Sequence, residues 1–126
     1  MKKLIVDTSS IISFFEGKNL PILYKAFEDG AVFLPAIVIS ELLNENLFIT
    51  YRKELKQILR SLPMCNSDFF HWANVGEISN RFAKIKITIR DAHIIQCALD
   101  ADILLHTQNT NFKKLSNKFN LKIIKK

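Results

Sequence analysis

The chain has 126 residues, which is the size of one domain, and 48% of them are hydrophobic while 24% are charged, an ordinary globular mixture. This composition excludes a disordered chain and a multidomain one, and no apolar run approaches the ~20 residues that a membrane-spanning helix needs. The 18 Lys and Arg against 12 Asp and Glu give a formal net charge of +6, which favours an anionic partner, most commonly nucleic acid.

The first half of the chain predicts short strands that alternate with helices. Its elements are a strand over 2–6, a helix over 11–15 capped by residues 8–10, a helix over 20–28, a strand over 31–34, helical spacing over 37–48 and a helix over 51–62. Because Asp7 and the polar residues 8–10 interrupt the first apolar run, we expect no targeting segment and a cytoplasmic protein.

The second half continues the same alternation after Pro63. Its elements are a brief strand over 64–65, a helix over 70–82 capped by Ser67 or Asp68, a loop over 84–88, a helix over 89–99, a strand over 102–106, a short helix over 112–119 and a last strand over 121–124. Short apolar strands between helices predict βαβ units. The fold class is therefore α/β, with a short central parallel sheet of four to five strands between two helical layers, in a single domain over 1–126.

Polar side chains follow the predicted strands where such sheets place their sites. Asp7 ends the first strand, Glu41 lies about two helical turns after the second, Asp91 opens the helix over 89–99, and Asn109 and Asn111 follow the strand over 102–106. If these strands are neighbours, the side chains converge on one cleft. The apolar residues around Glu41 predict a largely buried environment for it.

Three carboxylates in one cleft repel each other unless a cation neutralises them. Oxygen ligands suit Mg²⁺ or Mn²⁺, and such an ion can acidify a water molecule for attack on a phosphodiester. The basic surface would hold the phosphate backbone nearby. The residues therefore predict the parts of a metal-dependent nuclease.

Each of these residues also has a structural interpretation. Asp7 is equally well placed to cap a helix, and Asp91 complements a helix dipole. His93 could act as an acid or base, but a lone histidine on a helix is more often structural, and His71 beside Trp72 has no partner that suggests catalysis. The two cysteines, Cys65 and Cys97, form no zinc motif or disulfide framework and are expected to be reduced and buried.

Four short motifs together resemble the PIN domain family. They are Val6-Asp7-Thr8-Ser9 after an apolar strand, Ser40-Glu41-Leu42 after a Leu-Pro strand end, Arg90-Asp91-Ala92 at a helix start, and the stretch 104–112 with Thr107, Asn109 and Asn111. The motifs cover essentially the whole chain in the family's order. The chain is most similar to the small, stand-alone VapC-type toxins of type II toxin–antitoxin systems.

This resemblance implies a Mg²⁺- or Mn²⁺-dependent endoribonuclease that hydrolyses RNA phosphodiester bonds. It implies that Asp7, Glu41 and Asp91 bind the metal, that Asn109 orients water, and that Thr8, Ser9, Thr107 and Asn111 support them. It also implies a homodimer inhibited by a small antitoxin, with the segment 42–62 supplying much of the dimer or antitoxin surface.

One departure from the family's pattern leaves two alternatives open. The last motif commonly carries an Asp, whereas this chain has Asn109 and Asn111 and no acid between Thr107 and Phe112. The first alternative is a catalytically weakened PIN-like module that binds RNA or a protein. The second is a housekeeping nuclease for RNA processing or DNA repair.

Overall fold

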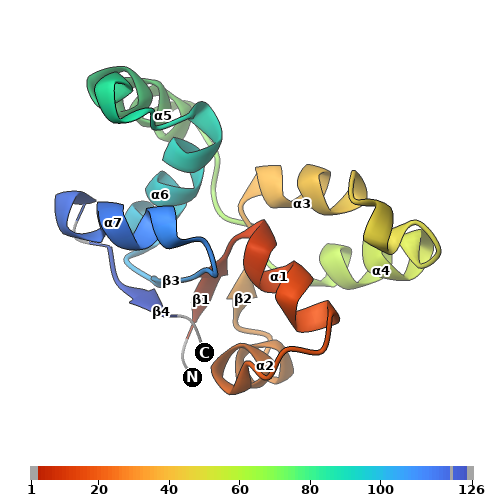
Figure 1. The fold of residues 1–126 in the computed structure, drawn as a ribbon. Coiled ribbons are helices and arrows are strands. Elements are labelled where there is room, and N and C mark those ends of the chain that lie inside the picture. The colour runs from red at the N-terminus through yellow and green to blue at the C-terminus, as the bar shows by residue number, and fades with distance from the viewer. Residues whose placement is uncertain (1–2, 120, 125–126) are drawn as a thin grey trace.

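The computed structural model describes residues 3–119 and 121–124, and it confirms the alternation of strands and helices (Figure 1). In chain order the elements are β1 (Leu4–Val6), α1 (Thr8–Phe15), α2 (Pro21–Glu28), β2 (Val32–Phe33), α3 (Ala36–Leu43), the 3₁₀ turn η1 (Asn46–Phe48), α4 (Arg52–Ser61), α5 (Phe69–Arg81), the 3₁₀ turn η2 (Ala83–Ile85), α6 (Ile89–Ala101), β3 (Leu104–His106), α7 (Thr110–Phe119) and β4 (Ile123–Ile124).

The sheet has four strands, all parallel, in the order β2-β1-β3-β4. The register pairs Leu4 with Val32 and with Leu104, so β1 lies at the centre of the sheet. All three residues of β1 are fully buried, as expected for a strand that is covered on both faces. The brief strand expected over 64–65 is reduced to one bridge between Leu34 and Met64.

The strand order fixes where a site can form. The connection from β1 to β2 runs one way across the sheet, and the connections from β2 to β3 and from β3 to β4 run the other way. Because such crossovers are right-handed, opposite directions place helices on opposite faces, which gives the three-layer α/β/α fold. The chain leaves β1 and β3 in opposite directions, so the crevice beyond their carboxyl ends is a topological switch point.

Three predicted elements differ in their details. The helical spacing predicted over 37–48 divides into α3 and η1, and the 3₁₀ turn η2 overlaps the start of the loop predicted over 84–88. The strand predicted from Asp102 begins at Leu104, because Asp102 ends α6 in the left-handed conformation with φ of 50°. The predicted strand residue Lys2 and the basic residues Lys125 and Lys126 lie outside the described residues.

The helices form two groups around the sheet. Figure 1 shows α1–α4 around the edge formed by β2, and α5–α7 around the edge formed by β3 and β4. The hydrophobic core joins both groups through residues such as Leu23, Leu42, Ile94 and Phe112, each at most 1% exposed. None of the helices in the described part of the chain is long and apolar enough to cross a membrane.

Candidate active site

Asp7 is a fully buried carboxylate at the end of β1. Its Oδ1 accepts hydrogen bonds from the backbone N–H of Ser10 at 3.2 Å and from the hydroxyl of Ser9 at 2.6 Å. Its Oδ2 accepts one from the hydroxyl of Thr107 at 2.5 Å. Asp7 thus caps α1, and the same bonds hold its carboxylate in one orientation. Capping and a role in the site are therefore compatible.

The loop after β3 is bonded to the start of α1. The backbone N–H of Gln108 donates to Ser9 Oγ at 3.0 Å, and that of Asn109 donates to Thr107 Oγ1 at 2.9 Å. Ser10 donates to the backbone oxygen of His106 at 2.8 Å. These bonds connect the carboxyl ends of β1 and β3 and fix Asp7 at the switch point.

Glu41 reaches the same place from α3. Its Oε1 accepts a hydrogen bond from the hydroxyl of Thr8 at 2.5 Å, so it lies beside the residue that follows Asp7. Its side chain is 30% exposed, which makes Glu41 half-buried and less enclosed than its apolar neighbours predicted.

Arg90 joins Glu41 to Asp91. Its Nε lies 2.6 Å from Glu41 Oε2, and another nitrogen of the same guanidinium lies 2.9 Å from Asp91 Oδ1. The hydroxyl of Thr88 caps α6 by accepting from the backbone N–H of Asp91 at 3.1 Å. Arg90 therefore places a cation between Glu41 and Asp91, and Thr8 links Glu41 to the residue next to Asp7. We refer to Asp7, Glu41 and Asp91 as the acidic cluster.

The arginine controls the charge state of this cluster. Burial alone would raise the pKa of Glu41, but hydrogen bonds from Arg90 and Thr8 and the charge of Arg90 outweigh it, so the pKa lies below its ordinary value. Burial would likewise lower the pKa of Arg90, but Glu41 and Asp91 raise it overall. Glu41 and Arg90 are consequently both charged at neutral pH.

The side chain of Asn109 bonds the backbone at the start of α7. Asn109 Oδ1 accepts a hydrogen bond from the backbone N–H of Asn111 at 2.9 Å, at the start of α7. The side chain of Asn111 is exposed. Among the described residues, Asn109 is linked to Asp7 through its backbone bond to Thr107, while its amide oxygen is bonded to the backbone of Asn111.

The residues of this cluster fit a divalent cation by chemistry. Three carboxylates offer hard oxygen ligands, which suit Mg²⁺ or Mn²⁺. Among the described residues, the oxygens of Asp7, Glu41 and Asp91 do not all come within 4.8 Å of one another. The guanidinium of Arg90 supplies positive charge between Glu41 and Asp91, so these carboxylates are not closed around an ion.

Sequence reasoning missed two features. The first is the role of Arg90 as a counter-ion, for which its position beside Asp91 is the available sequence signal. The second feature is the set of contacts that His71 makes with His93 and Asp100, which the sequence did not indicate. Of the two cysteines, Cys97 is buried as expected and Cys65 is half-buried.

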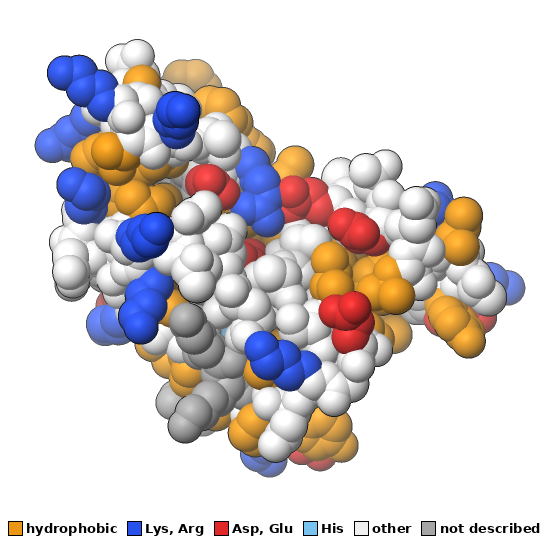
Figure 2. All heavy atoms as spheres, viewed as in Figure 1, with side chains coloured by type: hydrophobic (Ala, Val, Ile, Leu, Met, Phe, Trp, Pro, Cys, Tyr) orange, Lys and Arg blue, Asp and Glu red, His pale blue; other side chains and the backbone are white. Residues whose placement is uncertain are grey.

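Charge is unevenly distributed over the surface. Figure 2 shows Lys and Arg side chains gathered over the part of the molecule formed by α5–α7, and acidic side chains between that part and α3–α4. The exposed basic residues of the α5–α7 part are Arg81, Lys84, Lys86, Lys113, Lys114 and Lys118. A polyanion that lies on this basic surface passes close to the acidic cluster.

Comparison with protein-family models identifies the family of this chain. Residues 4–118 match the PIN domain family, and the chain therefore belongs to that family. PIN domains are generally nucleases and typically depend on divalent metal ions. A comparison with curated protein sequences finds no match.

Two solved structures share the fold over nearly the whole chain. A toxin–antitoxin complex from Klebsiella pneumoniae is 17% identical, has a TM-score of 0.74, and the match covers 98% of this chain and 97% of that one. The crystal structure of FitAcB from Neisseria gonorrhoeae is 15% identical, has a TM-score of 0.63, and the match covers 97% and 96% of the two chains. Both likenesses concern the fold.

Proposed function

We propose that this protein is a Mg²⁺- or Mn²⁺-dependent endoribonuclease that acts in the cytoplasm as the toxin of a type II toxin–antitoxin pair. The observation that supports the proposal is that Glu41, which Arg90 joins to Asp91, accepts a hydrogen bond from Thr8, the residue next to Asp7 at the switch point of a PIN fold. A structural neighbour that is itself a toxin–antitoxin complex supports the biological assignment.

The chain's own residues would supply the metal-binding carboxylates and the hydrogen bonds that hold them in place. Asp7, Glu41 and Asp91 would hold the metal ion, which when bound supplies an acidified water and offsets charge on the phosphate. Ser9, Ser10 and Thr107 fix the Asp7 carboxylate, so little reorganisation is needed when a cation binds. Thr8 fixes Glu41 in the same way.

An apolar surface on the part of the molecule formed by η1 and α4 supports a protein partner. A groove of about 360 Å³ lies along η1 and α4, lined by Phe15, Leu47, Phe48, Tyr51, Glu54, Leu55 and Ile58. Leu47 is 50% exposed and Tyr51 is 64% exposed, and contiguous apolar exposure of this kind is typical of an interface. We assign this groove to the antitoxin or to the homodimer partner.

The decisive experiment is RNA cleavage by the purified chain. We expect cleavage with Mn²⁺ or Mg²⁺, loss of cleavage with excess chelator, and loss in Asp91→Asn at unchanged secondary structure. If the wild-type chain cleaves no RNA in either ion, and its expression has no effect on growth, the proposal is wrong.

A second function, that of a weakened PIN-like module that binds RNA or a protein, is favoured by one observation. The amide oxygen of Asn109 accepts a hydrogen bond from the backbone N–H of Asn111. Because asparagine is neutral, Asn109 and Asn111 also bring no negative charge to the site. Calorimetric titration with Mn²⁺ separates the two functions, because a competent site takes up the ion and a weakened one does not. A neighbouring gene for a small antitoxin would separate the toxin from a housekeeping nuclease.

A further inference from the structure

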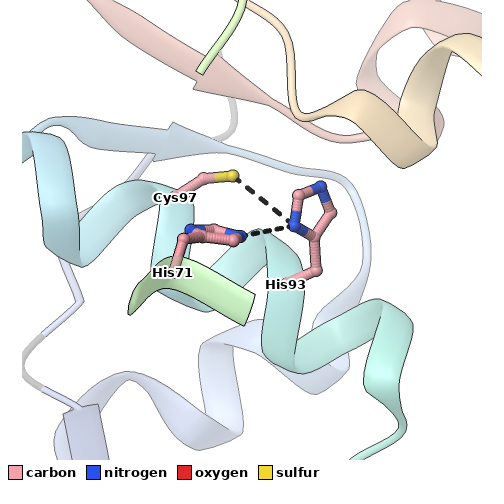
Figure 3. Close-up of side chains that lie close together, drawn as sticks. All are labelled: His71, His93 and Cys97. Atoms are coloured by element: carbon pink, nitrogen blue, oxygen red, sulfur yellow. Dashed lines mark hydrogen bonds between the residues drawn. The ribbon is translucent and has the colours of Figure 1, made fainter. Parts of the chain in front are cut away.

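A second group of metal-ligating side chains lies between α5 and α6, apart from the acidic cluster. His71 extends from α5, and His93 and Cys97 extend from α6 toward it (Figure 3). His71 Nε2 lies 2.7 Å from His93 Nδ1, and Cys97 Sγ lies 4.0 Å from the same nitrogen. The three donor atoms all lie within 4.8 Å of one another, and each residue is at most 2% exposed.

A hydrogen-bonded histidine pair explains only part of this arrangement. Buried polar networks in folded proteins normally satisfy every member. This one ends on His93 Nε2, which is buried and has no hydrogen-bond partner among the described residues. The indole of Trp72 stacks on the His93 ring, with centroids 4.6 Å apart and planes 9° apart, and so holds the ring in place.

The residues behind His71 have the arrangement found behind metal-binding histidines. Asp100 Oδ2 lies 3.0 Å from His71 Nδ1, and Gln96 donates to the other oxygen of Asp100 at 2.6 Å. A carboxylate on the outer nitrogen of a histidine fixes its tautomer and turns the inner nitrogen toward a metal. Here the inner nitrogen is Nε2, which faces His93 and Cys97.

We propose that His71 Nε2, His93 Nδ1 and Cys97 Sγ form a binding site for Zn²⁺ or a similar borderline-soft transition-metal ion that joins α5 to α6. Two imidazoles and a thiolate suit Zn²⁺ and do not suit Mg²⁺. Bond lengths of about 2.0–2.1 Å to nitrogen and 2.3 Å to sulfur require donor separations of roughly 3.3–3.6 Å. The two nitrogens must therefore move apart slightly, and the sulfur must move closer.

Binding of the metal ion would displace protons from the residues that bind it. The neighbouring Cys65 thiol and burial raise the pKa of Cys97, so Cys97 is a neutral thiol before the ion arrives. The thiol proton leaves to solvent when the S–metal bond forms, and a proton between the imidazoles moves to His93 Nε2. Net release is one proton per ion. One tetrahedral position remains for a water molecule.

The site would be separate from the acidic cluster but mechanically connected to it. Asp91 lies two residues before His93 on α6, so an ion that clamps α6 to α5 also restrains the start of the helix that carries Asp91. The inference does not depend on nuclease activity.

The test is titration of the full, reduced chain with Co²⁺, added both to the native protein and during refolding because the site is buried. We expect a thiolate-to-cobalt charge-transfer band that saturates at one equivalent and is removed by Zn²⁺. Cys97→Ser should abolish the band, and His71→Gln should weaken Co²⁺ binding at least tenfold. Absence of the band from the wild-type chain overturns the proposal without reference to any variant.

Two matched controls locate the ion. Cys65→Ser removes the other thiol of the chain and should keep the band, since Cys65 is not among the three converging donors. Asp7→Asn disrupts the acidic cluster and should also keep it. Persistence of the band in Cys97→Ser, or its loss in Cys65→Ser, contradicts the three-residue site. Loss in Asp7→Asn at unchanged secondary structure would contradict a site that is separate from the acidic cluster.

Discussion

Arg90 and Glu41 form a half-buried ion pair with 2.6 Å between Nε and Oε2, so the acidic cluster of this PIN domain contains its own counter-ion. The pair resolves the repulsion expected among three converging carboxylates without a bound metal. It also means that a divalent ion competes with Arg90 for the charge of Glu41 and Asp91.

Removal of this counter-ion should strengthen metal binding. In Arg90→Gln the glutamine can still donate a hydrogen bond but brings no charge. We expect the dissociation constant for Mn²⁺ to fall about tenfold, which corresponds to roughly 1.4 kcal/mol. We also expect the metal-free protein to lose stability, because Glu41 and Asp91 then repel each other.

Calorimetry with Mn²⁺ and thermal unfolding without metal measure the two effects. Arg60→Gln, at an exposed position in the last turn of α4, is the matched control and should change neither. Unchanged or weaker Mn²⁺ binding in Arg90→Gln would show that the arginine does not compete with the ion.

Asp7→Asn should abolish cleavage and lower stability together. The buried carboxylate accepts from Ser9, Ser10 and Thr107, and an amide replaces one acceptor oxygen with a donor. We expect a loss of about 1–3 kcal/mol in the free energy of unfolding, measured by urea denaturation. RNA cleavage measures the activity.

The control for this variant is Asp68→Asn. Asp68 caps α5 by accepting from the backbone N–H of His71 at 3.0 Å, so it matches Asp7 in residue type and capping role but is exposed and outside the cluster. It should retain full cleavage. Comparable cleavage activity in the two variants would show that Asp7 is not required for catalysis.

Asn109→Asp should increase divalent binding by severalfold. Aspartate retains the acceptor that caps α7 and adds negative charge next to the Thr107–Asp7 hydrogen bond. Asn111→Asp adds the same charge at an exposed position and is the control. Equal effects of the two substitutions on Mn²⁺ binding would indicate a general charge effect and no special role for position 109.

The stability of the protein should fall in mild acid because of His93. Burial, followed by the charges of His71 and Arg90, lowers the pKa of His93 from 6.5 to about 4. Between these values the unfolded chain binds a proton that the folded chain does not, so stability rises with pH through this window and falls as pH drops. Two further titratable groups lie beside this histidine pair: Asp100 contacts His71, and Cys97 contacts His93.

The lowered pKa of His93 should reduce the free energy of unfolding by about 3 kcal/mol at pH 4 relative to neutral pH. Urea denaturation at several pH values measures it. Between pH 4.5 and 6.5 the free energy of unfolding should depend less steeply on pH in His93→Gln than in the wild type. The difference corresponds to about one proton fewer taken up on unfolding. Parallel slopes would show that His93 titrates normally in the folded state.

The sequence by itself determined the class of fold and the positions of the acids along it. The first apolar run ends at Asp7, and a capped helix follows it. Such patterns are local, so they can be recognised in the sequence without knowledge of the fold. The alternation of strands and helices implied parallel strands, whose carboxyl ends share one edge of the sheet. Proximity of Asp7 and Glu41 followed as an expectation.

Only the tertiary structure decided which side chains meet. The bond between Arg90 and Glu41 joins residues on α6 and α3, and that between His71 and His93 depends on how α5 packs against α6. Neither the rotation of a helix about its axis nor the rotamer of a long side chain is encoded in residue spacing. His93 and Cys97, four residues apart on one helix face, were the one local signal of the second cluster, and His71 was needed to complete it.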